Sequence, residues 1–417
     1  MPFTKVYDKR ALRTGTIRSL DYWLGVPLCA LLTAVRALLP ERRRPPRRIL
    51  FLKFIEQGAT VLAQDAIARA TARVGRDNVL FCVFESNRAI LDLLDVVPAG
   101  NVLCIRDRSL LTFIGDFLDA LITMRRRGVD TVIDMEFFSR ASAIFSFLSG
   151  ATTRVGLHRF TGELPYRGDL MTHRVQYSPH VHIARQYALL LEAAFLEPVD
   201  EPLLKFPLAQ VANGVDASRQ FMPTAQEVNA VQERLGDHQG PVILLNPNAS
   251  DLLPLRKWAA ERFVELGRRL LAAYPGARIG VTGAPAEREA ADRLCAQIGS
   301  GAVSFAGKTN LRELLALYTV ADVLVTNDSG PAHFASLTPV HTVVLFGPET
   351  PRLFGSLAPA TTIIWKELAC SPCVSVFNHR LSPCRNNVCM QAIAVDDVFE
   401  AVAAALNGAS NPAAARL

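Results

Sequence analysis

The sequence predicts an α/β protein of two domains, each built on an open parallel sheet with helices on both faces. At 417 residues the chain exceeds the size that one hydrophobic core usually supports. From position 49 onward, short apolar runs alternate with longer helical stretches, the pattern of parallel sheets. Half of the residues are hydrophobic and a fifth are charged, so a sizeable core is available and extensive disorder is excluded.

The elements of the first domain follow an Arg/Pro run that ends at position 48. Short runs rich in apolar residues are predicted as strands, namely Ile49–Lys53, Val79–Phe84, Val102–Ile105 and Thr131–Met135. Helical stretches separate them, among them Val61–Val74 and Leu110–Arg127. This alternation predicts a parallel sheet whose strands share one carboxyl edge.

A segment rich in Pro, Gly and polar residues, 197–241, indicates a domain boundary with a helix near 225–235. The strands predicted beyond it are Val242–Asn246, Arg278–Thr282, a short one near Ser304, Val323–Asn327 and Thr342–Phe346. We therefore divide the chain into a basic segment (1–47), a first α/β domain (48–205), a linker (206–240), a second α/β domain (241–395) and a C-terminal helix and tail (396–417).

The positive charge is concentrated at the N-terminus. Residues 1–48 carry a net charge of +8 and the remainder −2, against +6 for the whole chain, so a nucleic-acid-binding body is excluded. The uncharged run Tyr22–Val35 is short for a transmembrane helix, and no signal-peptide cleavage site precedes the basic run. An amphipathic helix at the membrane interface fits this pattern, and a helix packed on the body is the alternative.

Eight cysteines scattered along a chain of this length do not form a secreted disulfide framework, which favours a reducing cytoplasm. Four of them, Cys370, Cys373, Cys384 and Cys389, combine a C-x2-C pair with a C-x4-C pair. The second spacing is looser than that of common zinc sites, so free thiols or an oxidisable pair are favoured over zinc.

The strongest motif follows the strand that ends at Thr326. The chain turns through Asn327-Asp328-Ser329-Gly330 and enters a helix that contains Pro331 and His333. Unpaired N–H groups at such a helix start suit a diphosphate, although Asp328 and Ser329 could equally cap the helix. Three other strands of this sheet also end in turns, at Asn246–Ser250, at Thr282–Pro285 and at Gly347-Pro348. The sequence contains no GxGxxG or Walker A motif, which argues against an NAD-binding or P-loop protein.

These motifs carry a family resemblance. The runs Ala306–Leu311, Asn327–His333 and Leu345–Pro348, with the opening Ile49–Leu62, resemble glycosyltransferase family 9, the ADP-heptose:lipopolysaccharide heptosyltransferases. The resemblance extends over about residues 48–408 in the same order. It implies a GT-B fold, in which two Rossmann-like domains face each other across a cleft, preceded here by the N-terminal amphipathic helix. It also implies inversion at the anomeric carbon, no required metal and no cofactor.

The resemblance assigns donor and acceptor sites to different domains. It implies that the second domain binds the nucleotide sugar through Asp328, Ser329, Gly330, His333, Ser250, Arg256 (or Lys257 in its place) and Glu287. The acceptor is expected on the first domain, where Arg106, Arg108, Arg140, Arg154, His158, Arg159 and Arg167 fall in or near loops. Of these, we predict Arg140, Arg154 and Arg159 as acceptor contacts, together with Lys53. Lys53 could also stabilise the negative charge of the leaving group.

One departure from the family concerns catalysis. The family's first loop contains Gly-Asp, whose Asp is the proposed general base, but this chain has Gly58-Ala59. Glu56 in the same loop and Glu136 after another strand are the alternative bases, because an inverting displacement needs a carboxylate within reach of the acceptor hydroxyl. Each could instead be a surface carboxylate or part of a structural ion pair.

The motifs predict a glycosyltransferase, and the resemblance implies that it is inverting and metal-independent. It would move a heptose-like sugar from a nucleotide diphosphate sugar, ADP-heptose by resemblance, to a lipopolysaccharide core or another lipid-linked glycan. The basic segment 1–47 would hold it as a peripheral protein on the cytoplasmic face of the membrane. An epimerase of the same fold and a non-catalytic sugar-nucleotide-binding protein are the alternatives, the second because of Ala59.

Overall fold

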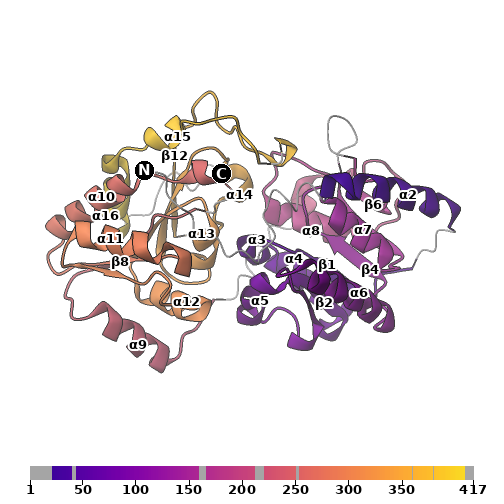
Figure 1. Cartoon of the computed structure of the whole chain (residues 1–417), viewed down its shortest axis with the longest axis horizontal. Coiled ribbons are helices and arrows are strands. Elements are labelled where there is room, and N and C mark those ends of the chain that lie inside the picture. The colour runs from indigo at the N-terminus through magenta and orange to yellow at the C-terminus, as the bar shows by residue number, and fades with distance from the viewer. Residues whose placement is uncertain are drawn as a thin grey trace. The chain divides into compact units, whose positions relative to one another are not determined.

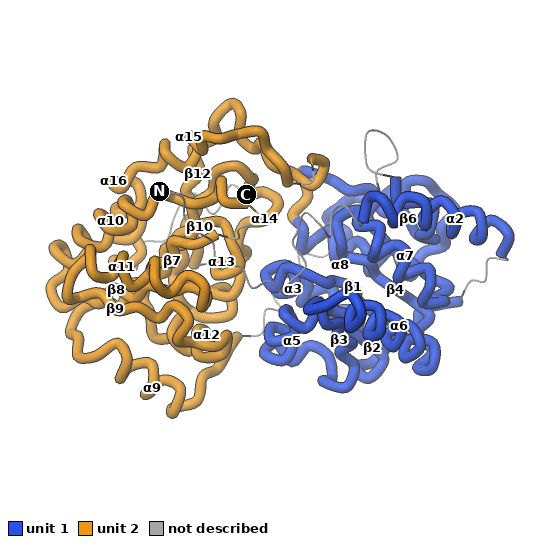
Figure 2. The backbone as a smooth tube through the Cα atoms, in the orientation of Figure 1, with its two compact units in different colours: residues 1–179, 183–217 blue, residues 180–182, 218–417 orange. Residues whose placement is uncertain are grey.

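The computed structural model describes residues 21–39, 44–158, 166–211, 220–249, 253–358, 360–378 and 380–408. The chain forms two compact units, residues 1–179 with 183–217 and residues 180–182 with 218–417 (Figure 2). Each unit is built on one six-stranded parallel sheet with helices packed on both faces (Figure 1). The prediction of two Rossmann-like domains is therefore confirmed. The division after residue 217 falls inside the predicted linker.

The sheet of the first unit has the strand order β3-β2-β1-β4-β5-β6. Its strands are β1 (Ile49–Leu52), β2 (Val79–Phe84), β3 (Val102–Ile105), β4 (Thr131–Asp134), β5 (Thr153–His158) and β6 (His173–Gln176). The order reverses between β1 and β4, which pair in register from Ile49 with Thr131 to Leu52 with Asp134. Open α/β sheets bind ligands at such a switch point, outside the carboxyl ends of the strands.

Helices cover both faces of this sheet. They are α2 (Gly25–Leu38), α3 (Gln57–Leu62), α4 (Gln64–Val74), α5 (Arg88–Leu94), α6 (Leu110–Arg126), α7 (Arg140–Leu148) and α8 (Ile183–Ala194). The crossovers through α6 and α7 run in the same direction along the sheet, so right-handed connection places both helices on one face. Helix α2 packs against α7, whereas α4 and α8 pack together on the other face.

The second unit repeats the same topology, with the order β12-β11-β10-β7-β8-β9. Its strands are β7 (Val242–Asn246), β8 (Arg278–Val281), β9 (Ala302–Ser304), β10 (Val323–Asn327), β11 (His341–Phe346) and β12 (Thr361–Trp365). Its helices are α9 (Ala225–Leu235), α10 (Ala260–Ala273), α11 (Arg288–Ile298), α12 (Leu311–Val320), α13 (Gly330–Ala335), α14 (Pro351–Phe354), α15 (Val388–Gln391) and α16 (Val395–Leu406). Here the switch point lies between β7 and β10.

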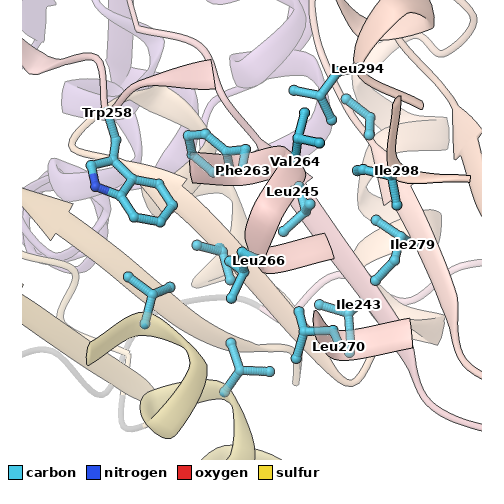
Figure 3. Close-up of a cluster of buried hydrophobic side chains, with 14 of the residues drawn as sticks. Ile243, Leu245, Trp258, Phe263, Val264, Leu266, Leu270, Ile279, Leu294 and Ile298 are labelled. Atoms are coloured by element: carbon cyan, nitrogen blue, oxygen red, sulfur yellow. The ribbon is translucent and has the colours of Figure 1, made fainter. Parts of the chain in front are cut away.

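The core of the second unit explains why its apolar runs become buried strands. Ile243 and Leu245 of β7 pack with Ile279 of β8 against α10 and α11, and Figure 3 shows these side chains together. Trp258 packs edge-on against Phe263, with ring centroids 4.9 Å apart, and its Nε1–H donates to the carbonyl of Ile393 over 3.0 Å. The loop before α10 is therefore fixed to the segment before α16.

The predicted strands are all present, and most bounds agree to within one residue. The predicted helix Val61–Val74 is divided at Ala63 into α3 and α4. Three strands were not predicted: β5, β6 and β12. Arg154 and Gly156 interrupt the apolar pattern of β5, and β6 is a short edge strand with polar residues.

The N-terminal helix exists, and by length and composition the helical stretch Asp21–Leu38 could cross a membrane. Its mean hydropathy is 1.2, and 11% of the stretch is buried. The stretch is longer than the uncharged run of the sequence because Asp21 and Arg36 are part of it. One side of it packs on the first unit, through Gly25 and Cys29.

Candidate active site

Two segments that are far apart in sequence meet at the switch point of the first sheet. Lys53 directly follows β1 and Glu136 lies two residues after β4, so the pairing of these strands brings the side chains to the same edge. The Lys53 ammonium lies 3.0 Å from Oε2 of Glu136 and 3.0 Å from Oε2 of Glu56. The structure thus places both predicted catalytic carboxylates on one buried lysine.

The two carboxylates differ in their surroundings. Glu136 is buried, and its Oε1 accepts the backbone N–H of Phe54 over 2.7 Å. The Glu56 side chain is 25% exposed. Burial of the Lys53 ammonium lowers its pKa, but Glu136 and Glu56 more than reverse this effect and hold the pKa above its ordinary value. Lys53 therefore stays charged, and Glu56 is the more accessible carboxylate.

The backbone of Glu56 is in an unusual conformation. Its φ and ψ are 72° and 80°, in the left-handed region that L-residues other than Asn and Asp rarely occupy. Such a conformation persists only where the surroundings enforce it, and it is common at functional sites. The carbonyl of Glu56 accepts the N–H of Ala59 over 2.9 Å in the first turn of α3. Position 59, where the family resemblance implies an Asp, is therefore one helical turn from Glu56.

A third carboxylate, next to this cluster, is enclosed at the end of β4. Asp134 is fully buried, and its oxygens accept the Glu136 N–H over 3.0 Å and the Ser142 hydroxyl over 2.8 Å. Burial raises the pKa of Asp134 to about 6, although Arg167, 3.7 Å away, opposes the shift. Asp134 thus helps to position Glu136 and is not accessible to a substrate.

In the second unit, the predicted donor loop follows β10 at the switch point with β7. The Asn327 side chain joins the neighbouring loops, because its Oδ1 accepts the N–H of Trp258 over 3.1 Å and its Nδ2 donates to the carbonyl of Asn248. Asp328 is buried, and its N–H donates to the carbonyl of Leu345 in β11 over 3.0 Å. The loop is therefore held rigidly between the ends of three strands.

A cluster of two buried carboxylates and two half-buried guanidinium groups lies beside this loop. Arg256 lies 3.4 Å from Oδ2 of Asp328 and also pairs with Glu349, which Arg380 approaches within 3.7 Å. Burial raises the pKa of Asp328, and Arg256 and Arg380 oppose the shift. Glu349 and Arg380 were not predicted from the sequence. The one sequence signal that could have found Glu349 is its position directly after the Leu345–Pro348 motif.

The helix after the donor loop, α13, is short, and Pro331 is its second residue. Gly330 is the first residue, and the Ser329 hydroxyl donates to the Asn327 carbonyl over 3.1 Å. His333 is buried one turn into the helix. Ser329, Gly330 and His333 thus lie at the start of α13, directly after Asp328.

Loops from three neighbouring strands converge at Gly283. A Cβ on this residue would lie 2.8 Å from Nδ2 of Asn248, 3.0 Å from Oε2 of Glu287 and 3.2 Å from Cβ of Ala306. Glu287 Oε2 also accepts the N–H of Ala284 over 2.7 Å, so this carboxylate caps the turn before α11. The predicted nucleoside contact Glu287 therefore lies at the same edge as the donor loop, with a structural role of its own.

The remaining predicted donor residues are Ser250 and Lys257. Ser250 lies outside the described residues. Lys257 is half-buried beside Arg256, and its backbone carbonyl accepts the Asn387 side-chain amide over 3.0 Å. Arg256 contacts both Asp328 and Glu349, so at least one of the two predicted cations lies directly against the donor loop.

The arginines predicted to bind the acceptor are mostly engaged elsewhere. Arg140 is buried and pairs with Asp21, which precedes α2, over 2.7 Å. Arg154 lies within β5, not in a loop, and donates to the carbonyls of Leu170 and Ala151. Arg159 lies outside the described residues. Of the predicted acceptor residues that the structure describes, Lys53 is the one beside both carboxylates.

No disulfide links the cysteines, all eight of which lie in the described part of the chain. Cys370 and Cys384 are exposed, and Cys373 and Cys389 are half-buried. Within the described residues, no group of three or more His, Cys, Asp or Glu side chains has an arrangement suited to a metal ion. We therefore assign no chemical role to the C-x2-C and C-x4-C pairs.

Comparison with known sequences identifies relatives over part of the chain. The sequence model of glycosyltransferase family 9 (heptosyltransferase) matches residues 121–380. Lipooligosaccharide heptosyltransferase 2 of Haemophilus influenzae is 28% identical over 231 residues, which are 54% of this chain and 63% of the relative. Lipopolysaccharide heptosyltransferase 2 of Escherichia coli is 26% identical over 54% of this chain and 61% of its own length. The chain thus spans about three fifths of the length of these curated relatives.

Solved structures share the fold over most of the chain. The structure of E. coli ADP-heptose LPS heptosyltransferase II has a TM-score of 0.63 at 18% identity and covers 87% of this chain and 99% of its own. A glycosyl transferase family 9 protein of Veillonella parvula has a TM-score of 0.66 at 16% identity and covers 88% of this chain and 100% of its own. At such identities the likeness concerns the fold, which agrees with the GT-B expectation.

Proposed function

The chain belongs to glycosyltransferase family 9, and from this premise we propose that it transfers a heptose-like sugar with inversion at the anomeric carbon. The donor would be a nucleotide diphosphate sugar, with ADP-heptose as the first choice, because the similar sequences are named heptosyltransferases. The acceptor would be a lipopolysaccharide core or another lipid-linked glycan. The observation that carries the proposal is the pair Glu56 and Glu136 on Lys53 at the switch point of the first sheet.

The second unit would bind the donor. In the proposal, Asp328 accepts hydrogen bonds from sugar hydroxyls while Gly330, Ser329 and His333 meet the diphosphate at the start of α13. Arg256 would add positive charge where the leaving group forms, because it lies against Asp328. Ser250 and Lys257 would supplement this contact, and Glu287 would lie near the nucleoside.

Catalysis would depend on the first unit. Glu56 would accept the proton of the attacking hydroxyl as the bond between the anomeric carbon and the diphosphate oxygen breaks. Lys53 and Glu136 would hold Glu56 in position, and Lys53 would also contact the acceptor. The strained backbone of Glu56 supports this assignment, because strain of this kind persists where a side chain must be aimed.

Acceptor binding is proposed for residues beyond Lys53 as well. Arg140, Arg154 and Arg159 remain the proposed contacts for an acidic acceptor, although Arg140 and Arg154 would have to act from buried positions. The proposal includes independence from metal ions, for which excess EDTA in the assay is the test. It also places the protein on the cytoplasmic face of the membrane, associated through residues 1–47.

One observation favours a second candidate function. Ala59 stands where the family has its proposed base, so a protein that binds a sugar nucleotide without transferring the sugar would need no further change. The two functions differ in a measurable way. A catalyst transfers sugar to membrane glycans, whereas a binding protein is only stabilised by the donor. An epimerase would convert the sugar nucleotide without any acceptor.

The experiment combines binding with turnover. Thermal shifts with ADP-, UDP-, GDP- and dTDP-sugars identify the donor, and transfer to membrane glycan extracts is then measured with that donor. We expect transfer by the natural chain, loss of transfer with Glu56→Gln, and loss of donor binding with Asp328→Ala. Donor binding without transfer would favour the binding protein. Full transfer by both Glu56→Gln and Glu136→Gln would refute the assignment of the base.

A further inference from the structure

The exposed apolar side chains of the first unit are concentrated on two helices. Of the 21 large hydrophobic residues that are exposed in the described part of the chain, 13 lie within 22–39 and 110–122. On α6 they are Leu110, Leu111, Ile114, Leu118 and Ile122. Steps of three and four residues from Leu111 to Ile122 place them on one stripe of the helix. Leu111 is 84% exposed, so a partner outside the fold must cover this stripe if it is to be buried.

The two helices belong to one layer of the unit. Helix α6 packs on α7 through Phe117 and Phe145, with ring centroids 4.8 Å apart. Helix α2 packs on the other flank of α7, where Cys29 joins Ile144 in a buried cluster. Figure 1 shows α7 between α2 and α6. Since α7 is largely buried, the outward stripes of α2 and α6 form two apolar ridges on the same face of the sheet.

Helix α2 is fixed closely enough to keep its outward stripe in place. A Cβ on Gly25 would lie 2.9 Å from the Arg140 side chain, and one on Gly168 would lie 2.8 Å from the Cys29 carbonyl. The Thr33 hydroxyl accepts the N–H of Asp169 over 2.9 Å. The side chains on the far side stay exposed, among them Trp23, Leu24, Leu28, Leu31 and Leu38.

Lys53, Glu56 and Glu136 form the proposed catalytic cluster. Both ridges begin at the edge of the sheet where this cluster lies. Helix α6 follows the carboxyl end of β3, so Leu110 and Leu111 lie at that edge. Asp21, just before α2, pairs with Arg140 at the start of α7, which follows β4. Tyr22 and Trp23 therefore lie at the same edge as Glu56. Tyr and Trp are enriched at the interface between lipid and water.

Basic side chains lie at the opposite end of the two ridges. Arg125, Arg126 and Arg127 at the end of α6 are exposed. Arg44 and Arg47, in the segment that leads from α2 to β1, are exposed too, and the next residue, Arg48, donates to the carbonyl of Arg127. Such a cluster beside an apolar surface is complementary to an anionic lipid leaflet. A partner protein with an apolar surface would not require such a basic cluster.

We propose that α2 and α6 form one bilayer-docking face and that α6 is a second membrane-contacting helix, inserted beside α2 into an anionic leaflet. The proposal rests on the membrane association included in the proposed function and deepens it. In this arrangement two parallel ridges hold the first unit against the bilayer, whereas the N-terminal helix alone would only tether it. Its catalytic edge is consequently oriented at the level of the headgroups, where a lipid-linked acceptor presents its sugar.

The experiment measures binding of the full chain to vesicles. The test variant carries Leu111→Gln, Ile114→Gln, Leu118→Gln and Ile122→Gln, four exposed positions whose change leaves the core intact. The matched control carries Val199→Gln, Met222→Gln, Leu381→Gln and Val388→Gln, which are exposed elsewhere. Both are sedimented with phosphatidylcholine vesicles that contain or lack phosphatidylglycerol, after circular dichroism has shown equal helix content.

We expect the α6 variant to lose affinity for anionic vesicles by about tenfold or more, because α2 alone remains inserted, while the control binds as the natural chain does. Equal binding by the α6 variant and the natural chain would overturn the proposal. So would a natural chain that is dimeric by size exclusion and becomes monomeric in the α6 variant with unchanged vesicle binding, because a second copy would then cover the stripe.

A separate measurement distinguishes this proposal from the proposed function. On a detergent-solubilised acceptor the α6 variant should transfer sugar at the rate of the natural chain, since the substitutions lie outside the catalytic cluster. A natural chain that binds vesicles through α6 but transfers no sugar would leave the docking face standing and refute the function. If the natural chain transfers sugar but its α6 variant binds vesicles normally, the function stands and the docking face is refuted.

Discussion

The ammonium of Lys53 lies 3.0 Å from Oε2 of Glu136, although 83 residues separate the two in the chain. Both side chains are buried, so removing one charge leaves the other without its main partner in a medium of low dielectric. This ion pair joins the loops after β1 and β4 and fixes the surroundings of Glu56. Its variants therefore separate a structural role from a catalytic one.

The first prediction compares the two carboxylates. Glu136→Gln should lower the free energy of unfolding by about 3 kcal/mol, because it breaks a buried pair. Glu56→Gln should cost about 1 kcal/mol or less, because Glu56 is partly exposed and Lys53 keeps Glu136, yet it should reduce kcat about 100-fold or more. Urea unfolding and transfer assays measure both quantities. Equal loss of stability in the two variants, with equal residual activity, would contradict the assignment.

The second prediction tests whether the base has moved by one turn of α3. Glu56 and Ala59 are joined by a backbone hydrogen bond in the first turn of this helix. In a Glu56→Gln background, Ala59→Asp should restore at least about a tenth of the lost activity, because it returns a carboxylate to the family's position. Ala59→Asn is the matched control and should restore nothing. Rescue by Asn as well as Asp would show that the effect is not that of a base.

The sequence predicts most of this arrangement because local patterns determine it. Apolar runs buried on both faces mark β1 and β4 in the first sheet and β7 and β10 in the second, and polar residues that follow such strands meet at one edge of their own sheet. Glu56, Glu136 and Asp328 could be found in this way. The strand β5 escaped prediction because the buried Arg154 satisfies its charge with backbone carbonyls, which no local pattern reveals.

The contacts that sequence reasoning could not supply join distant segments. Glu349 pairs with Arg256 across 93 residues, and Arg140 pairs with Asp21 across 119 residues. Neither pairing follows from spacing or periodicity, since each depends on how loops and an N-terminal helix pack onto a finished sheet. The sequence predicts Arg140 as an acceptor contact, and the structure adds its pairing with Asp21, four residues before α2.

The third prediction concerns pH. Burial raises the pKa of Asp134 to about 6 from the ordinary value of 3.8, so the folded state favours the protonated carboxyl. The stabilisation is complete below the ordinary value and is lost as the pH rises through about 6. Relative to Asp134→Asn, the natural chain should lose up to about 3 kcal/mol of unfolding free energy between pH 4 and pH 7. Thermal and urea unfolding at several pH values measure this difference, and parallel profiles would contradict it.

The fourth prediction concerns Glu349, which in the proposed donor site would compete with the diphosphate for Arg256. Its buried carboxylate pairs with that guanidinium beside Asp328, so negative charge is already present where the donor's phosphates are proposed to bind. Glu349→Gln should therefore tighten the binding of the free nucleoside diphosphate by about tenfold, because a like charge is removed from a site of low dielectric. Calorimetric titration measures the change, with Glu261→Gln on the exposed surface of α10 as the control. Weaker binding by Glu349→Gln would instead mean that Glu349 positions Arg256 for the diphosphate, in which case Glu349→Asp should retain part of the affinity that Glu349→Gln loses.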